Sequence, residues 1–227
     1  THHAGERSLL QYAPFTFELL GRLPKDEREL VVDVLKKIIA GQILDQTRFP
    51  DPQDLFFLND SQELEEYTYL VAGCVGEFWT DIVHLHHARG AATRARREQA
   101  RMFGQALQLI NIVRDVGADL AIGRCYIPAD ELKSAQIPRD RDFIKHPAFL
   151  GIHRDWSLKA REWLRNATDY VNGTPTYQLR LAAWLPAALG HCTLDLIASR
   201  RSVPLEKVKV SRVTVYHQLI AALLRCI

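Results

Sequence analysis

Polar side chains form a stripe along the otherwise apolar run LQLINIVRDVGADLAIGRCYIP, residues 107–128. Gln108, Asn111, Asp115 and Asp119 follow one another at spacings of three or four residues. At roughly 100° per residue of an α-helix, the four side chains share one face, while Leu, Ile and Val occupy most of the rest. A helix this apolar is largely buried, so its polar groups need partners other than bulk water.

The two carboxylates of the stripe lie one helical turn apart, and the amide of Asn111 lies one turn earlier. Such a pair is common on solvated helix faces and beside the arginines of a neighbouring helix. The same oxygen atoms also suit Mg²⁺, which commonly takes one or two carboxylates and leaves its other positions to water and substrate phosphate. Under this second interpretation Asp115, Asp119 and Asn111 are metal ligands. Gln108 and Asn111 are also candidate substrate-binding residues along the same wall.

Two arginines near the stripe would supply positive charge for phosphate oxygens. Arg114 lies within the predicted helix, and Arg124 follows it in GRCYIP. A guanidinium group binds phosphate through paired, charge-assisted hydrogen bonds. By its helical angle Arg114 points well off the stripe, so a structural salt bridge is an equally good interpretation of this residue.

The elements that must position these residues are helices, because a period of roughly 3.6 residues dominates the chain and no stretch favours a strand. The sequence therefore predicts an all-α fold in a single domain over residues 1–227. We expect Ser61 to cap one helix and Gly90 to end or follow it. Three prolines and many charges predict short helical turns and loop over 128–147. The predicted helices cover residues 6–20, 25–47, 61–87, 94–120, 155–172, 176–199 and 211 onward, with disturbances at Pro14 and Pro186.

Composition limits the class of protein. The 29 basic and 27 acidic residues give a net charge of +2 without a basic face, so we expect no nucleic-acid partner. The four cysteines lie far apart without metal-ligand spacing, which is typical of reduced thiols in a cytosolic protein. No signal peptide opens the chain, and no run of about 18 apolar residues would span a membrane. We expect a cytoplasmic monomer or weak dimer, for which peripheral contact with the inner membrane face stays open.

The motifs around the stripe resemble the squalene and phytoene synthase family. QxxNxxRDxxxD followed by GRCYIP resembles its second aspartate-rich motif, and YTYLVAGCVGEFW at 67–79 resembles its YxxxVAGxVG segment. GQILDQTRF at 41–49 and, more weakly, VKVSRVTVY at 208–216 are also similar to members, so the resemblance covers nearly the whole chain. It implies an isoprenoid synthase helical bundle around a central prenyl-binding cavity.

The resemblance also implies a reaction. Members condense two prenyl diphosphates head to head with Mg²⁺, and the similarity to bacterial squalene synthases implies farnesyl diphosphate, a presqualene diphosphate intermediate and NADPH for a final step to squalene. A phytoene or dehydrosqualene synthase, which finishes by proton loss, is the alternative, since GRCYIPADEL is equally similar to phytoene synthases. The sequence has no GxGxxG nucleotide motif, but squalene synthases of this family do not use one.

The segment 67–79 contributes a candidate base and an apolar wall. Tyr67 matches the family tyrosine proposed to assist the proton loss that closes a cyclopropane ring. A phenol with a pKa near 10 does this only with help from nearby cations or from the diphosphate. Val71 and Val75 would line the prenyl tunnel, whereas a half-buried core tyrosine and ordinary core valines are the simpler interpretations. Small residues should let a neighbouring backbone approach closely, namely Ala72, Gly73 and Gly76.

Family members carry a first aspartate-rich motif that faces the one described above. In this sequence no aspartate up to residue 60 begins a DxxxD or DxxxE. We therefore expect the chain to be N-terminally incomplete and to have no synthase activity by itself. The alternative from another class is a non-catalytic helical scaffold or assembly factor with the synthase fold. Such a protein should lose its metal carboxylates first, yet Asp115 and Asp119 are both in place.

Overall fold

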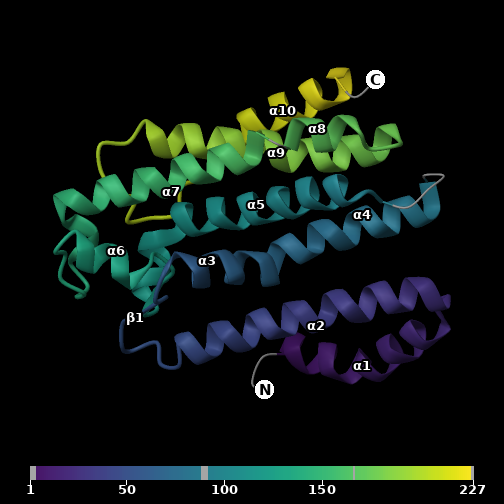
Figure 1. The fold of residues 1–227 in the computed structure, drawn as a ribbon, viewed down its shortest axis with the longest axis horizontal. Helices are drawn as coiled ribbons and strands as arrows, with labels where there is room; N and C mark the ends of the chain where they lie inside the picture. The colour runs from purple at the N-terminus through teal and green to yellow at the C-terminus, as the bar shows by residue number, and fades with distance from the viewer. Residues whose placement is uncertain (1–3, 88–91, 166, 226–227) are drawn as a thin grey trace.

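A computed structural model describes residues 4–87, 92–165 and 167–225 of the chain, so Gly90 lies outside the described residues. Its regular structure is almost entirely helical, which confirms the predicted all-α class (Figure 1). The elements are α1 Ala4–Arg22, α2 Lys25–Arg48, β1 Phe56–Phe57, α3 Ser61–Thr68, the π-helical turn η1 Tyr69–Gly73, α4 Cys74–His87, α5 Arg94–Ala121, β2 Arg124–Cys125, α6 Ala129–Ser134, the 3₁₀ turn η2 Phe143–Lys145, α7 Pro147–Arg165, α8 Ala167–Asn172, α9 Tyr177–Ala198 and α10 Arg212–Arg225.

The central element of the bundle is α5, which packs against η1 and α4 on one side and against α7, α8 and α9 on the other (Figure 1). α2 lies along η1 and α4, and α10 lies along α9. The core follows α5, whose buried apolar residues include Leu109, Ile112, Val113 and Val116. By contrast, no residue of α1 is buried. The helix that carries the polar stripe is therefore the best-packed element of the fold.

Small residues hold α4 and α5 close together, as the sequence predicts. A Cβ atom on Gly76 would lie 2.1 Å from the Ala100 carbonyl oxygen, and one on Gly104 would lie 2.3 Å from that of Ala72. Both distances are far below van der Waals contact, so any side chain at these positions would push the helices apart. The first half of α5 is thus seated against η1 and α4 by backbone contact.

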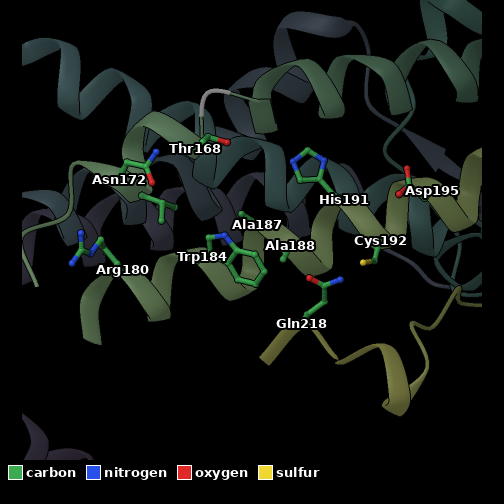
Figure 2. Close-up of a pocket in the computed structure, with 11 residues that line it drawn as sticks. Thr168, Asn172, Arg180, Trp184, Ala187, Ala188, His191, Cys192, Asp195 and Gln218 are labelled. Atoms are coloured by element: carbon green, nitrogen blue, oxygen red, sulfur yellow. The ribbon is translucent and has the colours of Figure 1, made fainter. Parts of the chain in front are cut away.

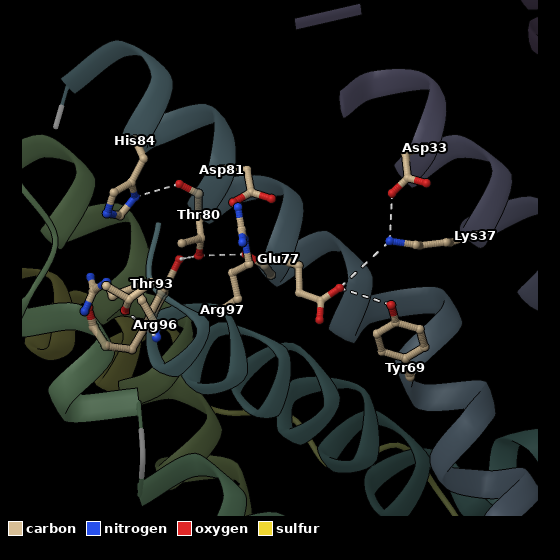
Figure 3. Close-up of polar contacts among 12 residues, drawn as sticks. Asp33, Lys37, Tyr69, Glu77, Thr80, Asp81, His84, Thr93, Arg96 and Arg97 are labelled. Carbon is tan, nitrogen blue, oxygen red and sulfur yellow. Dashed lines mark hydrogen bonds and ion pairs between the residues drawn. The ribbon is translucent and has the colours of Figure 1, made fainter. Parts of the chain in front are cut away.

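Polar contacts on the outer face of this layer join three helices (Figure 3). Lys37 on α2 pairs with Asp33 at 2.7 Å and lies 4.0 Å from Glu77 on α4, which also accepts a hydrogen bond from the Tyr69 hydroxyl at 3.1 Å. Arg97 on α5 donates to Asp81 on α4 at 2.7 Å. These exposed or half-buried pairs set the register of α2, α4 and α5 more than they add stability.

Three helix boundaries differ from the prediction. The helix over 61–87 is divided by the π turn η1, and its N-cap is Asp60, whose carboxylate accepts a hydrogen bond from the Glu63 backbone at 2.9 Å, not Ser61. The helix predicted over 155–172 begins earlier, at Pro147, because proline suits a first helical position. It ends at Arg165, and the shorter α8 follows. α1 and α9 continue through Pro14 and Pro186.

One parallel strand pair also departs from the prediction of no strands. Phe56 of β1 lies opposite Arg124 of β2, and Phe57 lies opposite Cys125. Two-residue strands are too short to show a period in sequence. The pair matters for the site, because it fixes the segment after α5 beside the segment after α2.

Among the described residues, α9 is the one helix long and apolar enough to cross a membrane by length and composition alone. It packs against α5, α7, α8 and α10, and Thr193 and Leu194 are buried in the bundle. Most of the other residues of α9 are partly or fully exposed.

Candidate active site

The predicted polar stripe lies where three other segments meet the C-terminal half of α5, two of them distant in sequence and the third, β2, directly after α5. α2 brings Asp45, β2 brings Arg124, and the connection between α9 and α10 brings Lys207. This connection passes directly over Gly117, where an added Cβ would lie 2.1 Å from the Leu205 carbonyl oxygen. A glycine here is therefore what allows Lys207 to reach α5.

Asp115 is held by two cations. Its oxygens accept hydrogen bonds from Nε and Nη2 of Arg114, both at 2.7 Å, and Nζ of Lys207 lies 2.9 Å away. Burial by itself would raise the pKa of Asp115, but the hydrogen bonds from Arg114 and Lys207 outweigh it and leave the pKa below the usual value. Arg114 thus forms the salt bridge that was one of its two interpretations, and Asp115 stays ionised at neutral pH.

Asp119 has the opposite environment one turn later. No hydrogen bond or ion pair to its carboxylate is found within the part of the chain that the structure describes. Burial, followed by the negative charge of Asp115, raises its pKa to about 6. A cation that binds beside a half-buried carboxylate without a partner is strongly favoured, since it offsets the free-energy cost of ionising that carboxylate. Asp119 is therefore the strongest metal-ligand candidate of the stripe.

The two predicted amides lie together further up the same helix. Nδ2 of Asn111 donates to Oε1 of Gln108 at 3.3 Å. Both side chains are half-buried, so they line the wall that Asp115 and Asp119 continue. Their part in binding substrate or metal stays a prediction.

Tyr67 lies against the end of a chain of hydrogen-bonded groups formed by Tyr126, Asp45 and Arg124. Its ring stacks on that of Tyr126, with centroids 5.0 Å apart and planes inclined by 22°, and the Tyr126 hydroxyl influences the pKa of Tyr67. The Tyr126 hydroxyl donates to Oδ1 of Asp45 at 2.6 Å, while Nη1 of Arg124 donates to Oδ2 of Asp45 at 2.7 Å. Because the Tyr126 proton is directed at Asp45, Tyr67 is left to donate to the Tyr126 oxygen.

Both phenols are neutral in this arrangement. Burial is the largest influence on each and raises the pKa of Tyr67 and of Tyr126 above the usual value for tyrosine. For Tyr126 the hydrogen bond to Asp45 raises the pKa further. Tyr67 is thus no ready-made base, and Arg124 is paired with Asp45 in this structure.

The two predicted tunnel valines lie at different depths. A Cβ atom on Gly41 of α2 would be 2.7 Å from Cγ1 of Val71, so Val71 fills the space between α2 and η1. Val75 is 39% exposed. Their lining of a prenyl tunnel stays a prediction, whereas the contact of Val71 with α2 is a packing role of the kind expected for core.

Sequence reasoning missed three residues of this cluster, Asp45, Tyr126 and Lys207. Each lies in or directly beside a segment that resembles the family, GQILDQTRF, GRCYIP and VKVSRVTVY. The signal was therefore present as similarity. The spacing of residues along the chain could not identify these three as one cluster, since helical periodicity does not show which segments pack together.

The oxygen-bearing side chains near the stripe can be compared with the ligands that a bound metal ion would need. Within the described ranges, no group of three or more histidine, cysteine, aspartate or glutamate side chains is placed to hold a metal ion. The facing helix α2 contributes Asp45 rather than an acidic cluster, and Asp45 is engaged by Arg124 and Tyr126. The unpartnered Asp119 suits a cation, but the full set of ligands for a diphosphate-bound cluster is not present in these residues.

A large cavity of about 680 Å³ lies elsewhere, between α8, α9 and α10 (Figure 2). Trp184, Ala187 and Ala188 contribute apolar lining, and Arg180 and His191 also line the cavity. None of the predicted site residues lines it. It is therefore a cavity separate from the polar stripe.

Comparison with known proteins supports the resemblance. The model of the squalene/phytoene synthase family matches residues 3–214. A bifunctional lycopene cyclase/phytoene synthase of Colletotrichum graminicola is 30% identical over 173 residues, covering 73% of this chain and 28% of that protein. A presqualene diphosphate synthase of Zymomonas mobilis is 27% identical over 162 residues, covering 71% of this chain and 54% of that protein. The chain thus spans less than two thirds of the length of these relatives.

Solved structures share the fold. A dehydrosqualene synthase in complex with ligand aligns with a TM-score of 0.69 at 22% identity, covering 99% of this chain and 78% of that one. Squalene synthase HpnC from Alicyclobacillus acidocaldarius aligns with a TM-score of 0.59 at 20% identity, covering 81% and 62%. At such identities the likeness establishes the isoprenoid synthase helical fold.

Proposed function

Because this chain belongs to the squalene/phytoene synthase family, we propose that it carries half of the site of a transferase that joins two prenyl diphosphates head to head. The observation that carries the proposal is the pair Asp115 and Asp119, one turn apart on α5, the first ionised by cations and the second short of one. We propose farnesyl diphosphate as the substrate and presqualene diphosphate as the intermediate. Squalene, made with NADPH, is the proposed product.

The reaction begins when the C1–O bond of one allylic diphosphate breaks and its electron pair leaves with the diphosphate. The double bond of the second substrate attacks C1, and loss of one proton closes a cyclopropane ring, giving the cyclopropylcarbinyl diphosphate, inorganic diphosphate and a proton. Asp115, Asp119 and Asn111 are the proposed holders of Mg²⁺, which when bound stabilises the leaving group as a Lewis acid. Lys207 and Arg114 keep Asp115 ionised for this role.

We propose that the proton leaves through Tyr67, Tyr126 and Asp45. The Tyr67 oxygen accepts the substrate proton while its own proton passes to Tyr126, and the Tyr126 proton passes to Asp45. This relay needs no phenolate, which removes the difficulty of two tyrosines with raised pKa values. Arg124 holds the Asp45 carboxylate in position to accept.

A substitution of Asp115 tests the synthase proposal against the scaffold alternative. In the full-length protein, Asp115→Asn should lower release of diphosphate from farnesyl diphosphate by about a hundredfold or more with the far-UV circular dichroism unchanged. The matched control is Asp142→Asn, which breaks an exposed ion pair with Lys145 away from the stripe. Unchanged turnover in Asp115→Asn would contradict the proposal and favour a scaffold. Products analysed with and without NADPH decide the last step, since a product unchanged by NADPH excludes squalene.

A tyrosine substitution tests the relay. Tyr126→Phe keeps the ring stacked on Tyr67 but removes the oxygen that passes the proton, so kcat should fall by about tenfold to a hundredfold with little change in KM. Tyr170→Phe is the control, because Tyr170 is also buried and its hydroxyl contact, to Thr80 at 2.9 Å, lies outside the proposed relay. Equal kcat values in the two variants would show that Tyr126 takes no part in proton transfer.

A further inference from the structure

The N-terminal helix α1 carries large apolar side chains that the bundle leaves uncovered. None of its residues is buried, and among the described elements none packs closely against it. At roughly 100° per residue, these side chains cover about 220° of its circumference, and the charged residues Arg7, Glu18 and Arg22 lie on the remainder. The apolar residues of α1 that are 46 to 75% exposed are Leu9, Leu10, Tyr12, Phe15, Phe17 and Leu19.

The outer face of α2 extends this apolar surface. Leu35, Ile39 and Ile43 recur at every fourth residue and are 42, 51 and 60% exposed. Their mean direction lies roughly 160° from that of Gly41, which meets Val71 of η1, so they point away from the bundle. Figure 1 shows α1 at the edge of the molecule, on the far side of α2 from α5. We call these three residues and the six of α1 the α1–α2 patch.

The size of the α1–α2 patch matches one side of a stable protein–protein interface. With roughly 100 Å² exposed on each large apolar side chain, the patch offers about 900 Å². The largest apolar patch of a typical monomer measures about 300 to 600 Å², whereas each partner in a standard interface contributes about 800 Å². The α1–α2 patch is therefore larger than the apolar surface that a monomer normally leaves exposed.

α1 also needs a partner for its own stability. An isolated helix of 19 residues is marginal in water, because most helical stability in proteins comes from packing of an apolar face. Pro14 lies inside α1, where it removes a backbone hydrogen bond of the helix. Contacts made by the apolar face must therefore stabilise α1.

The charges of the two helices indicate the kind of partner. α1 has two acidic and two basic residues, and α2 has five of each. Such a balance favours neither an acidic nor a basic partner, nor an anionic lipid surface. It does allow a second copy of the same surface, since the two copies carry no net charge to repel one another. A segment that completed the polar stripe would lie on the opposite side of α2, where Asp45 meets Arg124.

From the area, exposure and charge balance of this surface, we propose that the chain forms a twofold-symmetric dimer through the α1–α2 patch. The patch of one copy meets the same patch of the second copy, as an isologous interface requires. Burial of the apolar side chains supplies the free energy of association, and α1 gains the packing that it lacks in a single copy. The inference does not depend on the proposed function, since it uses no residue of the polar stripe.

Sedimentation velocity over a range of protein concentrations tests the proposal. The 227-residue chain should sediment as a dimer with a dissociation constant of about 10 μM or lower. The double variant Leu10→Glu with Phe17→Glu places two charges in the patch and should raise the dissociation constant by about a hundredfold or more. Both residues are exposed in a single copy, at 63 and 70%, so the far-UV circular dichroism of the diluted variant should match that of the diluted unchanged protein.

A matched control carries the same two changes elsewhere on the surface. Leu158→Glu with Leu224→Glu replaces residues of α7 and α10 that are 62 and 73% exposed, and it should leave the dimer intact. A monomer at every concentration overturns the proposal. So does a dimer that the patch variant leaves intact, or one that the control dissociates.

Amide hydrogen exchange of the unchanged protein gives a second readout that needs no variant. The amides of α1 should exchange more slowly as the concentration rises through the dissociation constant, because the dimer packs this helix. Protection of α1 that is the same at all concentrations would show that another part of its own chain covers the patch. That result would also overturn the proposal.

Discussion

The two halves of α5 are positioned by different kinds of interaction. The first half lies against η1 and α4 through backbone contacts, at Gly76 with Ala100 and at Gly104 with Ala72. The second half carries Asp115, which pairs with Arg114 on the same helix and with Lys207 in the connection before α10, and Asp119, whose pKa is influenced by Arg124 and Asp45. Steric contact between small residues is short-ranged and is fixed where two elements pack, whereas the environment of the two carboxylates also depends on α2 and on the connection before α10, which are distant in sequence. Substitutions in the two halves should therefore differ in kind and in size.

The largest effect is expected in the first half. Gly76→Ala places a Cβ against the Ala100 carbonyl oxygen, and overpacking of this kind should outweigh the helix-propensity gain of about 1 kcal/mol. We expect the free energy of unfolding to fall by about 2 to 3 kcal/mol in urea titration. Gly151→Ala on α7 is the control, since a Cβ there meets nothing within 4 Å and should raise stability slightly. If both variants were stabilised, the two helices would not be in backbone contact.

A smaller, pH-dependent effect is expected at Asp119. Its pKa rises from 3.8 to about 6 on folding, so the favourable contribution of the protonated form is complete below about pH 4 and lost as the pH rises through 6. Asp119→Asn should therefore be more stable than the unchanged protein at pH 8, by about 1 to 2 kcal/mol after solvent screening, and no more stable at pH 4. Urea titrations at the two pH values measure the difference. A stability gain that is equal at both pH values would mean that Asp119 is not the titrating group.

The smallest effect is expected at Lys207. Its side chain is 48% exposed, so the pair with Asp115 should contribute less than about 1 kcal/mol. The pKa of Asp115 is lowered in the folded state, so the contribution is present above the unfolded value of 3.8 and lost as the pH falls below it. Lys207→Met should lower stability at pH 7 and change it little at pH 2. Lys209→Met, two residues on and unpaired among the described residues, serves as the control, and an equal loss in both variants would exclude the contact with Asp115.

Much of the fold followed from sequence for a physical reason. Helical periodicity, proline positions and small residues act within one helix or one helix pair, so the all-α class, the extent of α5 and the close approach of η1 and α4 to it were predicted. The π turn over Tyr69–Gly73, the early start of α7 and the strand pair were not. Each of these depends on how a segment fits its neighbours, or is too short to leave a pattern.

The sequence by itself determined the stripe of Gln108, Asn111, Asp115 and Asp119, because one helix places its own side chains. Only the tertiary structure decided that the two carboxylates differ. Asp115 receives Lys207 because Gly117 lets a distant connection cross α5, while Asp119 on the same helix forms no ion pair within the described residues. Tertiary structure likewise joined Tyr67 to Tyr126 and Asp45. The charges around a side chain depend on which segments pack beside it. That packing is decided by the tertiary structure and not by the spacing of residues along the chain.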